Sequence, residues 1–313
     1  MYGLSGAERD ILRECSPRVK NFVEIKPTLS DLKNKLESNR RTFFDGLPNL
    51  IDKEQNSFEE LESKESEVEK EWNIKIKEIQ NSINKNKWKF WKYFDLLIKE
   101  RISKPKAIRN VQKEIKSQDD LLYELRSKPE EYFAREQSGT ISEINQLKRV
   151  VKSPEYYGAY GEYKARKELS KLSNDFHLIC NVKISFNHWI YYRGKRNLRE
   201  AQMDFVVVGP TGIYIIEVKN WSNETLRNHK RFSPHEQVDR AGKLLWRHLK
   251  NHTIFYKPRI TKVLVPIQHN IEYNSYYKSV LIRDVQNLSS FIEDNKRYPL
   301  SEKKVGHIVS ILR

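Results

Sequence analysis

The sequence predicts a helical region over residues 1–150, followed by a mixed α/β domain with one central sheet over residues 151–313. In the first region apolar residues recur at helical spacing, whereas in the second β-branched and aromatic runs alternate with helical stretches. Charge separates the two regions as well. Residues 1–150 hold 30 Lys+Arg and 27 Asp+Glu, a balance of +3, and residues 151–313 hold 28 and 15, a balance of +13.

The helical region carries two apolar clusters. Across residues 58–83 the spacing is three or four, with one break: Phe58, Leu61, Val68, Trp72, Ile76, Ile79 and Ile83. After a polar segment come Trp88, Phe90, Trp91, Phe94, Leu97 and Ile98. Both clusters fit either an antiparallel helical hairpin or a dimeric coiled coil, so we expect a homo-oligomer formed through these helices. The lysine-flanked aromatics of the second cluster could instead stack on single-stranded bases, although a helical stripe favours a packed core.

Composition limits the function classes. The mean hydropathy is −0.78 and 32% of the residues are charged. The longest uncharged run, residues 205–216, is shorter than the roughly 20 residues of a membrane span, so no membrane segment is expected. The first ten residues lack the apolar stretch of a secretory signal, and Cys15 and Cys180 are the two cysteines. We therefore expect a cytoplasmic protein without a disulfide framework.

The second region alternates strand-like runs with expected helices at residues 159–172, 235–250, 285–294 and 302–312. Its excess of positive charge points to an anionic partner. Four cations fall within seven residues between two predicted strands: Arg193, Lys195, Arg196 and Arg199. We expect them to form a loop that contacts a phosphate backbone, the alternative being a solvated loop without a ligand.

Two apolar strands flank the turn Gly209-Pro210-Thr211-Gly212, which is a hairpin pattern. If Val208 pairs with Ile213, Asp204 falls directly opposite Glu217. Opposed like charges destabilise a sheet, so a cation is expected between the two carboxylates.

Strand alternation places Lys219 on the same face as Glu217, which completes a set of residues suited to metal-assisted hydrolysis. The alternative is a structural ion-pair network, in which both acids pair with Lys219 and nearby arginines.

Two helix starts supply further candidates. A helix beginning near Gly158 places Glu162 on a buried stripe, where an unpartnered carboxylate would be costly; it should point into the same site, unless it pairs with Arg166. Residues 233–236 have the capping-box pattern with Pro234 at the first helical position, so Gln237 should lie in the first turn and orient a neighbouring group.

The sequence resembles the NERD (nuclease-related domain) family of the PD-(D/E)XK restriction-endonuclease-like superfamily over roughly residues 155–270. The matching residues are Gly161-Glu162, Asp204 before an apolar strand, Gly209-Pro210-Thr211-Gly212-Ile213, Ile216-Glu217-Val218-Lys219-Asn220-Trp221, Pro234 and Gln237. The resemblance implies a restriction-endonuclease-like fold, with Asp204 and Glu217 as metal ligands. It also implies Lys219 as the catalytic lysine, Glu162 as a further acidic residue and Gln237 as an accessory one. The long basic segment 187–200 departs from the family pattern.

Mg²⁺ prefers oxygen ligands and is commonly held by one or two carboxylates, which suits Asp204, Glu217 and the carbonyl of Val218. Lys219 could then orient or deprotonate a water, or neutralise phosphate charge. We expect a hydrolase, a nuclease dependent on Mg²⁺ or Mn²⁺, with DNA as the expected nucleic acid. The rivals are a non-catalytic nucleic-acid-binding protein that keeps the fold, and a coiled-coil scaffold. Phosphate binding alone would need cations rather than paired carboxylates.

Overall fold

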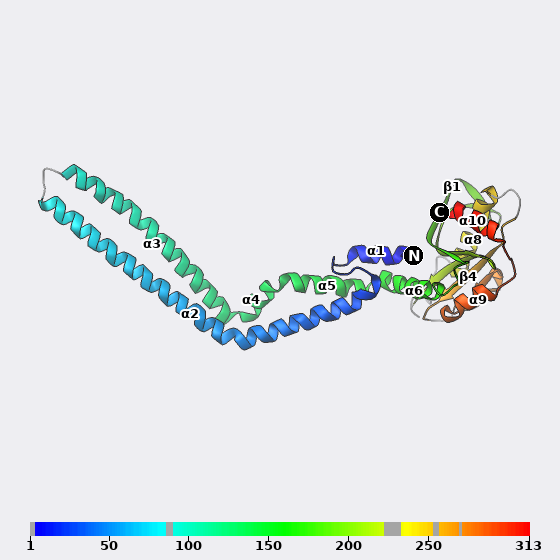
Figure 1. Cartoon of the computed structure of the whole chain (residues 1–313), viewed down its shortest axis with the longest axis horizontal. Coiled ribbons are helices and arrows are strands. Elements are labelled where there is room, and N and C mark those ends of the chain that lie inside the picture. Colours follow the sequence, from blue (N-terminus) through cyan, green and yellow to red (C-terminus); the bar gives the residue numbers. More distant parts are fainter. Residues whose placement is uncertain (1–3, 86–89, 222–232, 253–256, 269–270) are drawn as a thin grey trace. The chain divides into compact units, whose positions relative to one another are not determined.

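The computed structural model describes residues 4–85, 90–221, 233–252, 257–268 and 271–313 (Figure 1). Backbone contacts divide the chain into two compact units. The sheet unit comprises Met1–Leu29 and Asn145–Arg313, and the helical unit comprises Ser30–Ile144. The first 29 residues thus group with the sheet, whereas the sequence pattern assigns them to the helical region.

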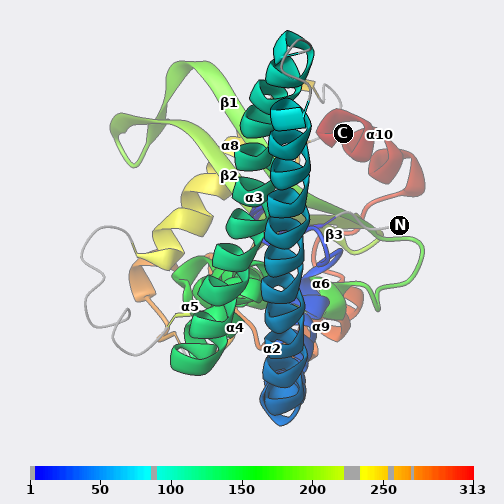
Figure 2. The same cartoon turned by 90° about the vertical axis from the view of Figure 1, so that its left-hand side faces the viewer.

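Two long helices dominate the helical unit. Helices α2 (Ile25–Lys85) and α3 (Phe90–Ser127) run antiparallel along each other (Figure 2). Side-chain amides connect them, since Gln112 Nε2 donates to Glu65 Oε1 at 2.8 Å and Gln118 Nε2 to Glu54 Oε2 at 2.6 Å. Helix α4 (Pro129–Glu136) and the start of α5 (Ser138–Lys152) follow. Of the two expected arrangements, the structure forms the antiparallel hairpin within one chain.

The second aromatic cluster does not pack as expected. Trp88 lies outside the described residues, as does the side chain of Phe90. Trp91 is 78% exposed, Phe94 and Ile98 are exposed as well, and Leu97 is half-buried. The packing surface expected from this cluster is therefore largely open to solvent, while residues elsewhere in the unit, such as Leu125 and Phe133, are buried.

The sheet has five strands in the order β1-β2-β3-β4-β5. They are β1 (His177–Tyr192), β2 (Lys195–Gly209), β3 (Gly212–Lys219), β4 (Ile260–Pro266) and β5 (Val280–Ile282). The first three strands are antiparallel, and β3, β4 and β5 are parallel. A mixed sheet that follows a long helical region confirms the predicted fold class.

Helices cover both faces of this sheet. Helices α6 (Pro154–Leu169) and α9 (Leu288–Asp294) pack on one apolar cluster, and α8 (Pro234–His252) and α10 (Glu302–Leu312) pack on the other. The chain also forms α1 (Gly6–Glu14) and the 3-10 turns η1 (Phe22–Glu24), η3 (Ser275–Tyr277) and η4 (Val285–Asn287). None of the helices, so far as their residues are described, combines the length and apolarity needed to cross a bilayer.

The register of the β2–β3 hairpin is the predicted one. Val208 pairs with Ile213, and the described pairs end at Phe205 and Ile216. Asp204 precedes Phe205 on β2. Its Oδ2 accepts a hydrogen bond from the backbone N–H of Val218 at 2.8 Å, so at this point a side chain of β2, rather than its backbone, bonds to β3. The two carboxylates consequently lie where the paired strands end.

The basic segment between β1 and β2 is not a loop, which corrects the expectation. It is the tip of a long hairpin, closed by a two-residue turn in which Arg193 (φ 46°) and Gly194 (φ 79°) both have positive φ. Positive φ at both central residues is the requirement of a type I′ turn. Lys195, Arg196 and Arg199 therefore belong to strand β2.

Candidate functional site

A cleft of about 730 Å³ lies where α6 meets the ends of β2 and β3. Four of the predicted site residues line it: Glu162, Asp204, Val218 and Lys219. Its other lining residues are Lys152, Pro154, Tyr157, Gly158, Asn220, Trp221 and Gln268. The structure thus gathers the four predicted residues, which come from α6, β2 and β3, around a single space.

Glu217 is buried, with 1% of its surface exposed, and does not line the cleft. One of its oxygens, Oε1, accepts from Lys219 Nζ at 2.6 Å and from Gln237 Nε2 at 2.5 Å. The other, Oε2, has no hydrogen-bond partner among the residues that the structure describes. A buried carboxylate oxygen is usually satisfied, because leaving it unpaired costs free energy.

Three carboxyl groups of the site resist ionisation. Burial raises the pKa of Glu217 to about 8, and the negative charge of Asp204 adds to the rise while Lys219 opposes it. Burial, followed by the charge of Asp204, raises the pKa of Glu162 to about 7. The pKa of Asp204 is also raised by burial, against the charge of Lys219 and the Val218 N–H. The charge of Lys219 therefore does not fully stabilise the ionised forms of these three carboxyl groups.

The available oxygens suit a hard divalent cation. Glu217 Oε2 lacks a partner, Asp204 uses Oδ2 for the Val218 N–H, and Val218 lines the cleft beside it. Within the described ranges, no cluster of three or more His, Cys, Asp or Glu side chains could hold a metal ion alone. Mg²⁺ accepts such sites, because it keeps several waters and takes one or two carboxylates. The donor set thus fits Mg²⁺ or Mn²⁺.

Helix α6 reaches the site through a close contact at Gly161. A Cβ atom there would lie 2.9 Å from Asn220 Cβ and 3.4 Å from Val218 Cγ1, so the helix packs tightly on the end of β3. The helix begins at Pro154, with Ser153 as N-cap, which places Glu162 in its interior rather than in the expected first turn. Arg166, the alternative partner for Glu162, pairs instead with Glu8.

Helix α8 begins at Pro234, as predicted, and this places Gln237 in its first turn. The amide of Gln237 reaches Glu217 from there. The hydroxyl oxygen of Ser233 lies 3.3 Å from His235 Nδ1. The role of Gln237 stays a prediction; its position beside Glu217 is a structural fact.

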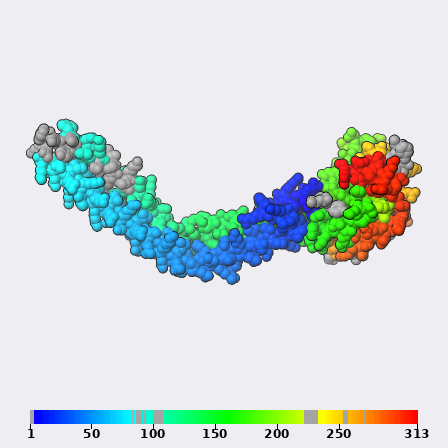
Figure 3. Space-filling view, in the orientation of Figure 1, coloured from blue at the N-terminus to red at the C-terminus, as the bar shows by residue number. Residues whose placement is uncertain are grey.

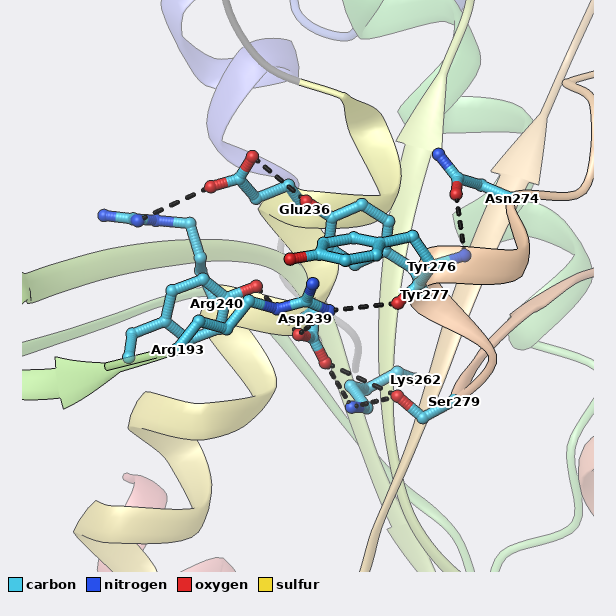
Figure 4. A network of polar contacts seen from close by, with 10 residues as sticks. Arg193, Glu236, Asp239, Arg240, Lys262, Asn274, Tyr276, Tyr277 and Ser279 are labelled. Carbon is cyan, nitrogen blue, oxygen red and sulfur yellow. Dashed lines mark hydrogen bonds and ion pairs between the residues drawn. The ribbon is translucent and has the colours of Figure 1, made fainter. Parts of the chain in front are cut away.

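The hairpin cations differ in their surroundings. Arg193 lies 4.1 Å and 4.2 Å from the ring centroids of Tyr276 and Tyr277, and it donates to Asp239 Oδ2 at 3.3 Å (Figure 4). Its guanidinium is thus engaged within the protein. Arg199 Nε donates to the carbonyl of Phe186 at 3.2 Å, and Arg196 lies over the ring of Tyr191.

A second groove, of about 650 Å³, follows this hairpin. It is lined by Ser185, Phe186, Asn187, Trp189, Asn197, Arg199, Glu200 and Arg240. Trp189 is 53% exposed and Tyr191 is 60% exposed. Exposed aromatics beside cations can stack on nucleic-acid bases, and neither Trp189 nor Tyr191 was predicted as a site residue.

Asp239 on α8 is the centre of a separate polar network (Figure 4). It accepts from Lys262 Nζ at 2.5 Å and from the Tyr192 hydroxyl at 2.8 Å, besides Arg193. Burial alone would raise the pKa of Asp239, but the hydrogen bonds from Lys262 and Tyr192 and the charges of Lys262 and Arg193 lower it. The network joins the hairpin tip to α8 and β4.

The structure adds residues that sequence reasoning missed. Lys152, Tyr157 and Gln268 line the cleft, and the backbone N–H of Ala7 donates to Glu162 Oε2 at 3.4 Å. Nothing in the pattern connects the first helix with a residue 155 positions away. The one usable signal was Ser5-Gly6-Ala7-Glu8, a capping-box pattern that predicts a helix start but not its neighbour.

Comparison with known proteins adds one finding. Neither the curated proteins nor the solved structures include a match to this chain. The sequence model of the nuclease-related domain, NERD, matches residues 157–267. This stretch contains Glu162, Asp204, Glu217, Lys219 and Gln237. Over residues 157–267 the chain is therefore similar to the nuclease-related domain family, and the resemblance expected from the sequence is confirmed.

Proposed function

We propose that this protein is a nuclease, dependent on Mg²⁺ or Mn²⁺, that hydrolyses phosphodiester bonds of nucleic acid, with DNA as the expected substrate. The observation that carries the proposal is the set formed by Asp204, Glu217 and Lys219, in which Glu217 Oε2 is buried and unpartnered among the described residues. The similarity of residues 157–267 to nuclease-related domains and the balance of +13 in residues 151–313 support it.

The cation would be held by Asp204, Glu217 and the carbonyl of Val218. When bound, it supplies positive charge for the phosphate oxygens and lowers the pKa of a bound water. Gln237 and Lys219 both donate to Glu217 Oε1, and this fixes the carboxylate and leaves Oε2 available. Lys219 stays an ammonium in this ion pair, so we assign it to charge stabilisation and water orientation rather than to proton abstraction.

Glu162 lines the cleft beside Asp204 and would orient the attacking water. Outside the cleft, we propose that Lys195, Arg196 and Arg199 contact phosphates from strand β2, all three being exposed. Arg193 anchors the hairpin tip instead, because its contacts with Asp239 and Tyr276 occupy it.

The direct experiment is a cleavage assay on linear, circular, single-stranded and double-stranded DNA, and on RNA. Each is incubated with Mg²⁺, with Mn²⁺ and with chelator. We expect metal-dependent cleavage that Glu217→Gln abolishes and that the matched surface variant Glu302→Gln leaves unchanged, because Glu302 is exposed at the start of α10. Absence of cleavage with either metal would overturn the proposal.

A second candidate is a nucleic-acid-binding protein without catalysis. The contact of 2.6 Å between Lys219 Nζ and Glu217 Oε1 favours it, since an ion pair can serve structure alone. Binding of DNA with no cleavage, and with no change in melting temperature on addition of Mg²⁺ or Mn²⁺, would support this candidate over the nuclease.

We also propose that the helical unit associates with a second copy of the chain. The exposed apolar side chains of α3 are the surface that carries this proposal: Trp91, Phe94, Leu96 and Ile98. Light scattering of the full chain should give a dimer or larger assembly that Trp91→Lys together with Ile98→Lys dissociates. A monomeric wild type would refute it.

A further inference from the structure

The β1–β2 hairpin continues beyond the rest of the sheet as an arm, residues 183–203. The described pairs of β2 with β3 begin at Phe205, so this part of β2 pairs with β1 instead. Figure 2 shows the arm extending from the sheet, and its yellow-green atoms lie at the surface in Figure 3. Its inward side chains are buried in the apolar cluster under α8 and α10, among them Ile190, Tyr192 and Leu198. Burial of this face fixes the arm to the sheet unit.

The ladder of the arm is interrupted by a bulge at the groove of about 650 Å³. Residues 186–189 of β1 lie opposite Arg199 of β2, where the register shifts. Across the bulge, Arg199 Nε donates to the carbonyl of Phe186 at 3.2 Å. Trp189 belongs to the bulge, is exposed, and lines the groove together with Arg199. Bulges re-aim side chains, and this one brings an indole and a guanidinium to the same groove.

A second exposed ring follows two residues along β1. Tyr191 faces Arg196, its partner on β2, whose Cζ lies 5.2 Å from the ring centroid. Ile190 lies between the two rings in sequence and is buried, so the backbone that carries both rings is held by the core. Because their backbone is fixed, Trp189 and Tyr191 need little further ordering to bind a ligand.

The ligand that suits this surface has planar apolar faces and negative charge. The bases of a single strand offer such faces, and its phosphates complement the charges of Lys195, Arg196 and Arg199. In a duplex the bases stack on one another, so their faces are closed to a protein ring. We infer that the arm binds an unpaired stretch of nucleic acid, with Trp189 and Tyr191 stacked on its bases. The inference rests on the proposed function, because it names single strands as the substrate class of that nuclease.

One strand connects the groove with the cleft. Arg199 precedes Asp204 by five residues on β2, and a strand rises about 3.3 Å per residue, so roughly 17 Å separate them. Stacked nucleotides are about 3.4 Å apart, so about five of them would cover this distance. Among the described residues that line the groove, Arg199 and Arg240 also outweigh the charge of Glu200. A single strand in the groove would therefore reach Asp204 within a short stretch.

The test is equilibrium binding of a labelled single-stranded DNA oligonucleotide, and of the duplex of the same sequence, in chelator. Trp189→Ala and Tyr191→Ala should each weaken single-strand binding roughly fivefold to 100-fold, and should leave duplex binding within about twofold of the wild type. Trp189→Phe keeps a ring and should retain most of the affinity. The slope of log affinity against log salt should stay unchanged in these variants, because no phosphate contact is removed.

The matched control is Tyr273→Ala, since Tyr273 is 63% exposed, close to the 53% of Trp189 and the 60% of Tyr191, and lies outside the arm. It should leave binding unchanged. Three results would each overturn the inference: unchanged single-strand binding in both arm variants, an equal loss for single strand and duplex, or an equal loss in Tyr273→Ala.

The assay also separates this inference from the proposed nuclease, because binding is measured without metal. A wild type that cleaves with Mg²⁺ but fails the binding test would keep the nuclease and refute the single-strand arm. A wild type that passes the binding test but cleaves nothing with either metal would keep the arm and refute the nuclease.

Discussion

The sheet unit contains two clusters of charge, one around the buried Glu217 and one around the partly buried Asp239, and they differ in how their carboxylates are satisfied. Asp239 accepts hydrogen bonds from Lys262, Tyr192 and Arg193, and its pKa is lowered. Glu217 has one satisfied oxygen and one without a partner among the described residues, and its pKa is raised to about 8.

The two clusters differ in charge balance: the chain's own donors stabilise the carboxylate of Asp239, whereas the Glu217 cluster lacks positive charge. In the Asp239 network, cations and hydroxyls of the chain already stabilise the ionised carboxylate. In the Glu217 cluster, Asp204 and Glu162 add negative charge, and Lys219 is the cation that contacts Glu217. A cluster of the second kind is a candidate functional site, and this contrast supports the proposed cation site at Glu217.

The largest expected effect is on catalysis. Glu217→Gln removes a charge that the cation needs, so cleavage should fall at least about 100-fold. The rise in melting temperature caused by Mg²⁺ or Mn²⁺ should disappear as well. With chelator, the variant should be as stable as the wild type or more stable, since a like-charge contact with Asp204 is relieved.

Melting curves with chelator and with excess metal, next to the cleavage assay, measure these effects. Asp204→Asn should behave in the same way. Lower stability in chelator combined with retained cleavage would show that Glu217 is a structural ion-pair residue.

The next effect is on stability. Asp239→Asn leaves Lys262 and Arg193 without their partly buried counter-charge, so the free energy of unfolding should fall by roughly 2 kcal/mol. Denaturant titration in chelator measures the loss. The metal-induced rise in melting temperature should persist, because Asp239 is not part of the cleft. If the variant is fully stable, the Asp239 network does not stabilise the fold.

A smaller effect concerns pH. The pKa of Glu217 is raised in the folded protein, so this group favours folding below about pH 4.5, where the unfolded chain is also protonated. That contribution is lost as the pH rises through about 8. In chelator, the wild type should therefore lose stability relative to Glu217→Gln between these limits.

The measurement is the difference in free energy of unfolding between the two proteins at several pH values. The difference cancels titrating groups that do not interact with Glu217, whereas Asp204, Lys219 and Glu162 interact with it and contribute to the difference. A constant difference across the range would show that Glu217 ionises normally.

The smallest effect is on binding. Neutralising Lys195, Arg196 and Arg199 should reduce the slope of log affinity against log salt, by up to about 0.9 for each phosphate that these side chains no longer neutralise. Fluorescence titrations with DNA in chelator at several salt concentrations measure the slope. Neutralising Lys303 and Lys304, which are exposed on α10, is the control and should change the slope less. Equal slopes in all variants would exclude the hairpin from phosphate binding.

Local pattern predicted much of the candidate site. Turn residues and strand alternation were enough for the pairing of Val208 with Ile213, because hairpin register follows from the turn. Ser233 before α8 and Pro234 at its first position were enough to place Gln237 in the first turn. The unpaired oxygen of Glu217 could not be predicted, since it depends on which groups approach from other elements.

The sequence by itself determined most of the helices and strands and the alignment of two carboxylates across one hairpin, although it predicted a loop where β1 and β2 continue. These properties depend on neighbours a few positions apart, through backbone sterics, capping and side-chain alternation. Tertiary structure alone decided that Arg193 stacks on Tyr276, that Asp239 gathers four donors, and that the backbone N–H of Ala7 reaches Glu162. Such contacts join residues far apart in the chain. They form when faces of helices and strands pack together, and this packing cannot be inferred from the spacing of neighbouring residues.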